Sequence, residues 1–174
     1  MKEDTFQDVV PTNEGGYSSD YETQRDKPMP SYNHSILQLK IGTLLYNYYG
    51  KEFTLGSETD LDLPNASRPT VPDISIFEKR KPSLSNDTLK VKEPPLTTIE
   101  ILSPKQDLEN VKDKIFNNYF PAGIKSAWVV VPTTRTVTIY TPDEKFVTYA
   151  TGKFTDGATG IALDIDEVFE DLEL

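Results

Sequence analysis

The chain has 174 residues and a formal net charge of −10, and its hydrophobic content of 36% favours one packed domain over a disordered chain. It contains no cysteine, which excludes disulfides, thiolate metal sites and cysteine nucleophiles. We expect a cytoplasmic protein that does not enter a membrane, because no apolar run approaches about 20 residues and the acidic start MKEDTFQDVV is unlike a secretory signal.

The negative charge is concentrated at the two ends of the sequence. Residues 1–30 carry seven acids and three bases, and residues 164–174 carry six acids and no base. The segment 31–163 therefore holds 15 acids and 15 bases and is neutral. A partner with a phosphate backbone is compatible with this neutral middle, although the total charge alone would argue against it.

Residues 1–30 are polar and rich in glycine, serine and proline, so we expect a loosely ordered lead with one short strand. A single domain should then span 31–174. Apolar residues recur at helical spacing over 34–49 and predict a helix, with Ser31 or Asn33 as its cap and Gly50 as its end. The residues of this apolar stripe are Ile36, Leu37, Ile41, Leu44, Leu45 and Tyr48.

The middle of the sequence predicts strands separated by a long loop. An irregular strand or strand pair is expected over 53–63, and the alternation in 73–78 is typical of a half-buried strand. Prolines and serines predict a loop over 79–96. A further strand over 97–102 ends at Ser103-Pro104 and is followed by a helix over 106–120, which Gly123 closes.

The last third predicts more strands. The continuous apolar run 127–131 is typical of a strand buried on both faces. A C-terminal hairpin is expected from 136–141 and 145–150, and the acidic tail 161–172 predicts a last strand or a short helix. This order of elements predicts an α/β fold with a mixed central β-sheet flanked by helices.

Two carboxylates stand out among these elements. Asp73 follows Val71-Pro72 at the start of one predicted strand, and Glu100 lies between Ile99 and Ile101, 27 residues further on. Two acids on neighbouring strands would make an oxygen site for Mg²⁺, with Mn²⁺ as an alternative. The other interpretation is an exposed aspartate at a strand end and an edge strand with its polar face in water, but an unpaired acid in so apolar a strand would be costly.

Lysines follow the second carboxylate closely. Lys105 comes directly after the strand, and Lys112 and Lys114 lie in the helix that returns over the sheet. A lysine beside a metal can stabilise developing phosphate charge, which would make this a metal-dependent nuclease. Lysines on the surface of a helix are also common, and each alone indicates little.

The remaining candidates each have a structural alternative. His34, the single histidine, either contacts phosphate or catalyses, or it serves packing or capping. Glu58 is a third acid that could face the same cleft, or it is a turn residue. A basic cluster after the Asp73 strand either steers phosphate towards the metal or is a solvated loop. Its members are Lys79, Arg80, Lys81, Lys90 and Lys92.

Three stretches together carry a resemblance: RPTVPDIS (68–75), PLTTIEILSP (95–104) and YFPAGIKSAWVVVP (119–132). They resemble the bacterial Putative restriction endonuclease family, which belongs to the PD-(D/E)xK nuclease superfamily. The resemblance covers roughly 28–170. The superfamily's usual lysine position is Leu102 here, and the family commonly moves that lysine to the following helix. The interval from Lys114 to Tyr119 is one residue longer than the family pattern.

The resemblance implies a restriction endonuclease-like fold, with Asp73 and Glu100 as Mg²⁺ ligands and Glu58 as a further ligand, directly or through water. It implies that Lys114, with Lys112 as the second choice, assists hydrolysis of a DNA phosphodiester by metal-activated water. It also implies that such an enzyme can work as a homodimer. The alternative hypothesis is a nuclease-fold module without activity that binds nucleic acid or protein.

Overall fold

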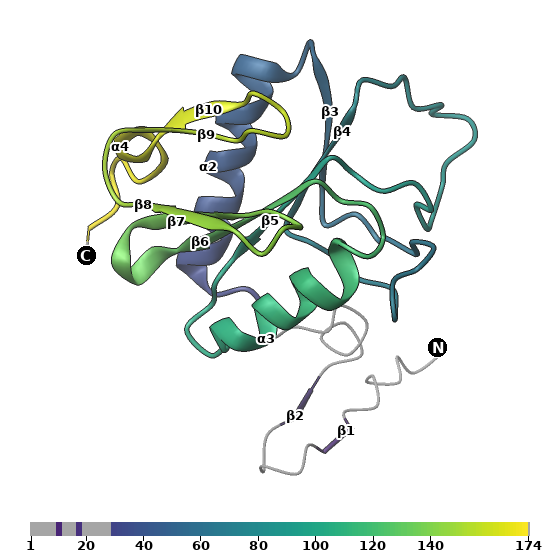
Figure 1. Ribbon diagram of the computed structural model, residues 1–174, viewed down its shortest axis with the longest axis horizontal. Coiled ribbons are helices and arrows are strands. Elements are labelled where there is room, and N and C mark those ends of the chain that lie inside the picture. The colour runs from purple at the N-terminus through teal and green to yellow at the C-terminus, as the bar shows by residue number, and fades with distance from the viewer. Residues whose placement is uncertain (1–9, 12–16, 19–28, 174) are drawn as a thin grey trace, which may run out of the picture.

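The computed structural model describes residues 10–11, 17–18 and 29–173. Most of the predicted lead 1–30 lies outside these residues. Its described part is a pair of short antiparallel strands, β1 (Val10–Pro11) and β2 (Tyr17–Ser18). From residue 29 onward the chain forms a mixed sheet with helices on both faces (Figure 1), which confirms the predicted fold class.

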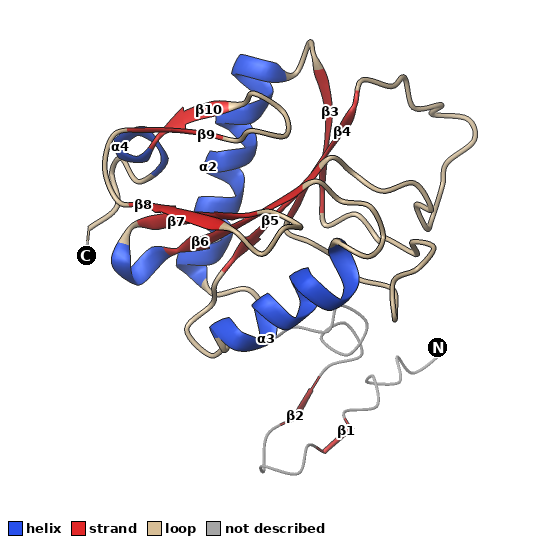
Figure 2. Cartoon of the chain, in the orientation of Figure 1, coloured by secondary structure: helices blue, strands red, loops and turns tan. Residues whose placement is uncertain are grey.

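Six strands form the central sheet in the order β3-β4-β5-β6-β7-β8, which is also their order in the sequence (Figure 2). Their bounds are β3 Phe53–Ser57, β4 Ile74–Glu78, β5 Thr97–Ile101, β6 Ser126–Val131, β7 Thr136–Tyr140 and β8 Phe146–Tyr149. Only β5 and β6 pair in parallel, since the chain crosses over through a helix between them. This helical crossover carries the predicted lysines past the end of β5.

One face of the sheet is covered by α2 (Tyr32–Tyr49), by α4 (Ile165–Val168) and by a two-stranded sheet of β9 (Lys153–Thr155) and β10 (Ala162–Asp164). The opposite face is covered by α3 (Leu108–Lys114), which continues as the π-helix η1 (Ile115–Tyr119). A short 3₁₀ turn, η2 (Pro132–Thr134), joins β6 to β7.

The core is divided by the sheet into two apolar clusters. On the α2 side, Leu37 and Ile41 of the helix pack with Ile76 of β4 and Ile99 of β5. On the other side, residues of the α3 and η1 segment pack with Phe77, Val129 and other strand residues. Because side chains alternate along a strand, neighbouring residues enter different clusters. Glu100 of β5, and Asp73 directly before β4, therefore lie within a densely packed sheet.

Most element predictions are confirmed, with informative exceptions. Helix α2 begins at Tyr32, and Ser31 caps it by accepting a hydrogen bond from the His34 N–H. The predicted apolar stripe holds except at Tyr48, which is exposed. The prediction that 73–78 is half-buried is wrong: Ile74 through Phe77 are buried on both faces. The acidic tail contains both a strand and a helix, and β9 was missed.

The search for membrane-spanning segments covered only the described residues. None of the helices there combines the length and the apolar character that crossing a bilayer requires.

Candidate active site

Asp73 lies directly before β4, against the end of β5. The antiparallel register pairs Ile74 with Ile99, so continuing it by one residue places Asp73 beside Glu100. The Asp73 carboxylate also accepts a hydrogen bond of 2.7 Å through Oδ2 from the Ile101 backbone N–H. That N–H belongs to the peptide bond that joins Glu100 to Ile101. The two predicted acids are therefore neighbours at one end of the sheet.

The other oxygen of Asp73 contacts the single histidine. His34 Nε2 lies 3.0 Å from Asp73 Oδ1, and His34 Nδ1 lies 2.9 Å from the Ser103 hydroxyl. A carboxylate only accepts, so Nε2 donates to Asp73. His34 is 2% exposed, and both ring nitrogens are engaged. The predicted phosphate contact by His34 is therefore not available in this arrangement, because the ring is enclosed by protein.

Glu100 is 1% exposed within β5 and is paired from the helical side. Its Oε1 accepts a hydrogen bond from the Tyr119 hydroxyl and lies 2.9 Å from Lys114 Nζ. Lys114 itself is 5% exposed. By contrast, Lys112 is partly exposed and pairs with Glu109 on the helix surface. Of the two lysines proposed for this role, the structure brings only Lys114 to the carboxylates.

The π-helix explains how Lys114 and Tyr119 both reach Glu100. These residues are five apart, and an ordinary α-helix would turn them to different sides. In η1 the Phe120 N–H donates to the Ile115 carbonyl over 3.0 Å, a five-residue step that widens the turn. A π-turn accommodates one extra residue in a helix. The interval from Lys114 to Tyr119 is one residue longer than in the family pattern, and the π-turn accommodates this extra residue.

The electrostatics of the site are dominated by burial. Burial raises the pKa of the Tyr119 phenol well above its usual value, and the Glu100 carboxylate raises it further. The Tyr119 O–H therefore stays protonated and remains a donor to Glu100. Lys114 Nζ lies 5.5 Å from the centre of the Tyr119 ring. Although this ammonium forms an ion pair with Glu100, it makes no well-directed hydrogen bond within the described residues.

A polar pocket of about 480 Å³ opens beside Lys114. Arg68 and Lys105 contribute cationic side chains to its wall, and four amide side chains come from α3 and the segments on either side of it. These amides are Gln106, Asn110, Asn117 and Asn118. Lys114 lines this pocket, but its Nζ atom is itself buried.

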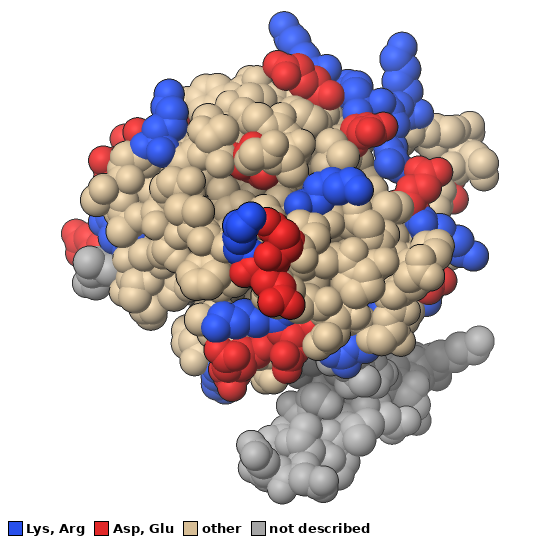
Figure 3. All heavy atoms as spheres, in the orientation of Figure 1, with Lys and Arg blue, Asp and Glu red and all other residues tan. Residues whose placement is uncertain are grey.

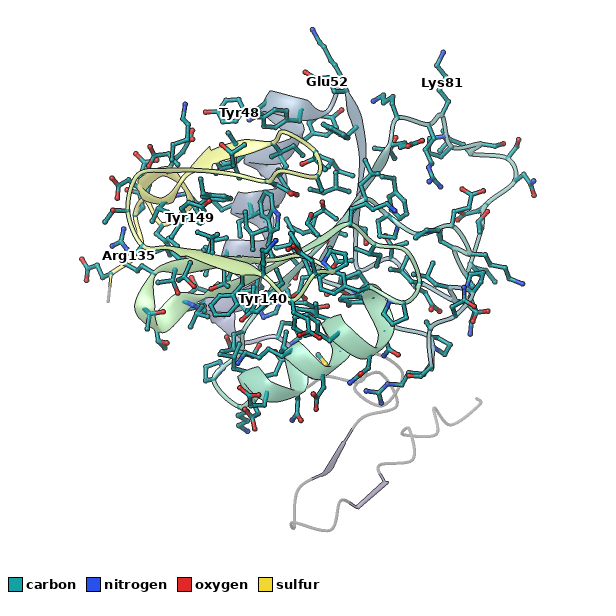
Figure 4. The ribbon with its side chains drawn as sticks, viewed as in Figure 1. Tyr48, Glu52, Lys81, Arg135, Tyr140 and Tyr149 are labelled. Atoms are coloured by element: carbon teal, nitrogen blue, oxygen red, sulfur yellow. The ribbon has the colours of Figure 1, made fainter. Side chains whose placement is uncertain are left out.

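The predicted basic cluster lies elsewhere. Lys79 and Arg80 follow the end of β4 that is farthest from Asp73. Figure 4 shows Lys81 projecting outward at the edge of the fold opposite α3, and Figure 3 shows basic side chains gathered in this region with acidic ones among them. Arg80 pairs with Glu93 at 2.9 Å. The structure brings Lys105 to the site, but it does not bring this cluster there.

Glu58 lies near the candidate site, but its side chain borders another pocket. Its backbone N–H donates to the Asp73 carbonyl over 3.1 Å, so the residue is close to the site. Its backbone adopts a φ of 52°, and its half-buried side chain borders a different pocket, between α2 and β3. Among the residues that the structure describes, no group of three or more His, Asp or Glu side chains is arranged to hold a metal. A three-carboxylate cluster that includes Glu58 is therefore not formed.

Three residues of the site were missed as functional candidates. The sequence predicts Ser103 as the end of a strand, Tyr119 as a residue of the helix over 106–120, and Arg68 as one residue of a motif. The signal for Tyr119 was its hydroxyl, because a buried tyrosine usually finds a polar partner. The signal for Ser103 was its position next to the strand end that carries Glu100. Neither signal identifies the partner without the fold.

A family model described as "Putative restriction endonuclease", Uma2, matches residues 22–174. The chain belongs to this family. The Uma2 match spans the central sheet, all described helices and the whole candidate site. No curated protein sequence matches the chain significantly.

A solved structure similar to this Uma2 chain is that of a protein from Anabaena variabilis, which is described as a putative nuclease belonging to DUF820. The two chains are 23% identical, and the match covers 82% of this chain and 83% of that one with a TM-score of 0.70. At this identity the likeness supports the fold. Together with the family match, it agrees with a nuclease-like function for this Uma2 protein.

Proposed function

We propose that this protein is a metal-dependent endonuclease that hydrolyses DNA phosphodiester bonds. Asp73 and Glu100 would hold Mg²⁺, and Lys114 would assist the reaction. The observation that carries the proposal is the adjacency of Asp73 and Glu100 at one end of the sheet, with the Lys114 ammonium 2.9 Å from Glu100. Homodimer formation and a cytoplasmic location stay predictions.

The donor set fits Mg²⁺ better than a metal that needs a full protein cage. Two carboxylates supply hard oxygen ligands, and Mg²⁺ in enzymes commonly takes one or two carboxylates together with water and substrate phosphate. The described residues contain neither a cluster of three acids or histidines nor a cysteine. Asp73 and Glu100 are thus the ligands we expect, and Glu58 remains a prediction as a ligand through water.

The residues of the chain would divide the work of catalysis. Bound Mg²⁺ supplies a water of lowered pKa and polarises the phosphate. The Lys114 ammonium would stabilise the negative charge that develops on the phosphate, because it lies 2.9 Å from Glu100, a proposed ligand of the metal. The Tyr119 hydroxyl fixes Glu100 Oε1. Lys105 and Arg68 in the pocket wall would attract the DNA backbone, and this attraction weakens with salt.

A second candidate function is a nuclease-fold module that binds nucleic acid or protein without cleaving it. The observation in its favour is that both carboxylates already have protein partners and are almost fully buried. A buried pair of this kind can be purely structural. Against this, a polar pocket with the cationic side chains of Arg68 and Lys105 in its wall lies beside Lys114.

Cleavage of supercoiled plasmid with Mg²⁺ tests the proposal. Wild-type protein should nick the plasmid with Mg²⁺ or Mn²⁺ and stop in EDTA, and Asp73→Ala and Glu100→Gln should abolish nicking. The matched control is Asp143→Ala, which removes an exposed carboxylate in the turn between β7 and β8 and should cleave like wild type. Wild-type protein that binds DNA in a salt-dependent way without cutting it under either metal would favour the second candidate.

A further inference from the structure

A buried chain of hydrogen bonds joins Ser103, His34 and Asp73. The Ser103 hydroxyl is 2.9 Å from His34 Nδ1, and His34 Nε2 is 3.0 Å from Asp73 Oδ1. The three side chains are 5%, 2% and 0% exposed. They come from the loop after β5, from the first turn of α2 and from the residue before β4. The contacts therefore join three segments that are distant in the sequence.

Helix α2 holds Asp73 at a second point as well. Gln38, one turn after His34, donates through Nε2 to the Asp73 backbone carbonyl over 3.1 Å. The remaining carboxylate oxygen, Oδ2, accepts from the Ile101 N–H. Both oxygens and the carbonyl of Asp73 are thus fixed by identified donors. A buried histidine needs a polar partner for each ring nitrogen, and here one of the two partners is the proposed metal ligand Asp73.

The hydrogen-bonded series of Ser103, His34 and Asp73 has the residues of a serine–histidine–aspartate catalytic triad, but it cannot work as one. A nucleophilic serine needs room for substrate at its hydroxyl, whereas Ser103 is 5% exposed and its hydroxyl is turned towards the buried imidazole. The direction of the contacts points instead towards Asp73. The imidazole fixes the aspartate, and the serine fixes the imidazole.

We infer that His34 and Ser103 are positioning residues that orient Asp73 as a metal ligand. This inference rests on the proposed function, because it presumes that Asp73 binds Mg²⁺. Residues that hydrogen-bond to a metal ligand fix its orientation, and their loss typically lowers metal affinity or activity about 10- to 100-fold. His34 therefore acts through Asp73 and does not touch the substrate.

Two substitutions of His34 separate its two contacts. In His34→Gln the amide nitrogen can occupy the place of Nε2 and still donate to Asp73. In His34→Asn the shorter amide reaches only the place of Nδ1, so it can keep Ser103 but loses Asp73. Ser103→Ala removes the outer contact alone. Leu37→Ala is the control, because it opens a cavity beside the same helix without touching Asp73.

The measurement is calorimetric titration of Mn²⁺ and Mg²⁺ into each purified protein without DNA. The midpoint temperature of thermal unfolding is measured for each protein as well. We expect His34→Asn to weaken metal binding about 10- to 100-fold, His34→Gln to retain most of the affinity, and Ser103→Ala to lie between them. Leu37→Ala should lower the thermal midpoint and leave metal affinity unchanged.

The outcomes distinguish this inference from the proposed function. If wild-type protein binds neither metal, the proposed function and the inference both fail. If wild-type protein binds metal and His34→Asn, folded at the titration temperature, binds it equally well, only the inference is overturned. Equal losses of metal affinity in His34→Gln and His34→Asn would also overturn it, because the hydrogen bond to Asp73 that His34→Gln keeps would then make no difference to metal binding.

Discussion

The two ends of β5 each carry a buried carboxylate cluster, and the clusters are built from different chemistry. At the N-terminal end, Asp156 is 0% exposed and accepts hydrogen bonds from Thr97, Ser126 and the Trp128 indole, at distances of 2.7 to 3.1 Å. Each of these three partners is neutral. At the C-terminal end, Asp73 and Glu100 face a histidine, a lysine and a tyrosine.

The difference indicates which cluster can exchange its partners. Hydroxyl and indole donors fixed in strands give Asp156 a complete set of contacts that no ligand needs to replace. A cation such as Lys114 compensates a buried charge, and a metal ion can share or take over this role. We therefore assign the Asp156 cluster to holding β9 and its following turn against the sheet. The Asp73–Glu100 cluster retains the chemistry of a site.

The sharpest test of the structural assignment is Asp156→Ala. It removes the acceptor that three buried donors share, so that the Thr97 and Ser126 hydroxyls keep only their 2.6 Å contact with each other, and each unsatisfied group costs roughly 1–3 kcal/mol. Because the three share one acceptor and are not additive, we expect a total loss of about 4 kcal/mol or more in the free energy of unfolding. Urea unfolding followed by tryptophan fluorescence measures it, since Trp128 lies in the cluster.

The same variant should bind metal like wild type at a temperature where it stays folded. The control is Asp143→Ala, whose exposed pair with Lys145 should contribute little to the urea midpoint. Metal affinity lost in Asp156→Ala, with the fold retained, would contradict the separation of the two clusters.

The fold was largely predictable because its signals are local. The apolar run 127–131 and the hairpin around Pro142 were read correctly from short-range patterns. The prediction that 73–78 is half-buried failed because Ser75 is polar but buried. A polar residue in an alternating run normally indicates a solvent-exposed face of the strand. Burial of the second face is supplied by α3, and a short pattern in β4 carries no information about that helix.

The site was only partly predictable for a related reason. The residue types of Asp73, Glu100 and Lys114 suggested chemistry, and their spacing to motifs supported it. The partners of these residues depend on register and on helix geometry. The sequence favours Lys114 over Lys112, but only the π-turn after α3 shows how both Lys114 and Tyr119 reach Glu100. The link from Ser103 through His34 to Asp73 needed three separate segments to meet.

The exchangeable character of the second cluster is tested by Lys114→Met. This variant keeps an unbranched apolar side chain but removes the ammonium, which leaves Glu100 without its cation. Without metal we expect a loss of about 3 kcal/mol in the free energy of unfolding, and we expect plasmid cleavage to be lost. Added Mg²⁺ should restore part of the stability, because a bound cation replaces the missing charge. Thermal unfolding with and without Mg²⁺ measures both effects.

The control for that experiment is Lys112→Met, which removes a lysine of the same helix whose partner is Glu109 on the surface. It should leave the unfolding midpoint, its response to Mg²⁺ and plasmid cleavage unchanged. If Lys112→Met abolished cleavage while Lys114→Met did not, the assignment of the lysine would be reversed.

The smallest expected effect belongs to Tyr119→Phe, which removes only the hydroxyl that donates to Glu100. A hydrogen bond to a charged group contributes roughly 1.5–3 kcal/mol, so we expect a loss of about 2 kcal/mol at pH 7. Burial raises the pKa of Tyr119 in the folded protein, whereas in the unfolded chain it stays at about 10. The wild-type advantage should therefore be constant below pH 10.

Above pH 10 the unfolded wild-type chain loses the Tyr119 proton while the folded protein keeps it. Ionisation then stabilises only the unfolded state, so the advantage over Tyr119→Phe should shrink by about 1.36 kcal/mol per pH unit. Comparing the two proteins in urea at several pH values from 8 to 11 cancels the other tyrosines and lysines, which titrate in both. An advantage that stayed constant up to pH 11 would mean that the folded phenol ionises as easily as the unfolded one. In that case neither burial nor Glu100 would raise the pKa of the Tyr119 phenol in the folded protein. The cluster around Glu100 would then be more accessible to water than its burial indicates.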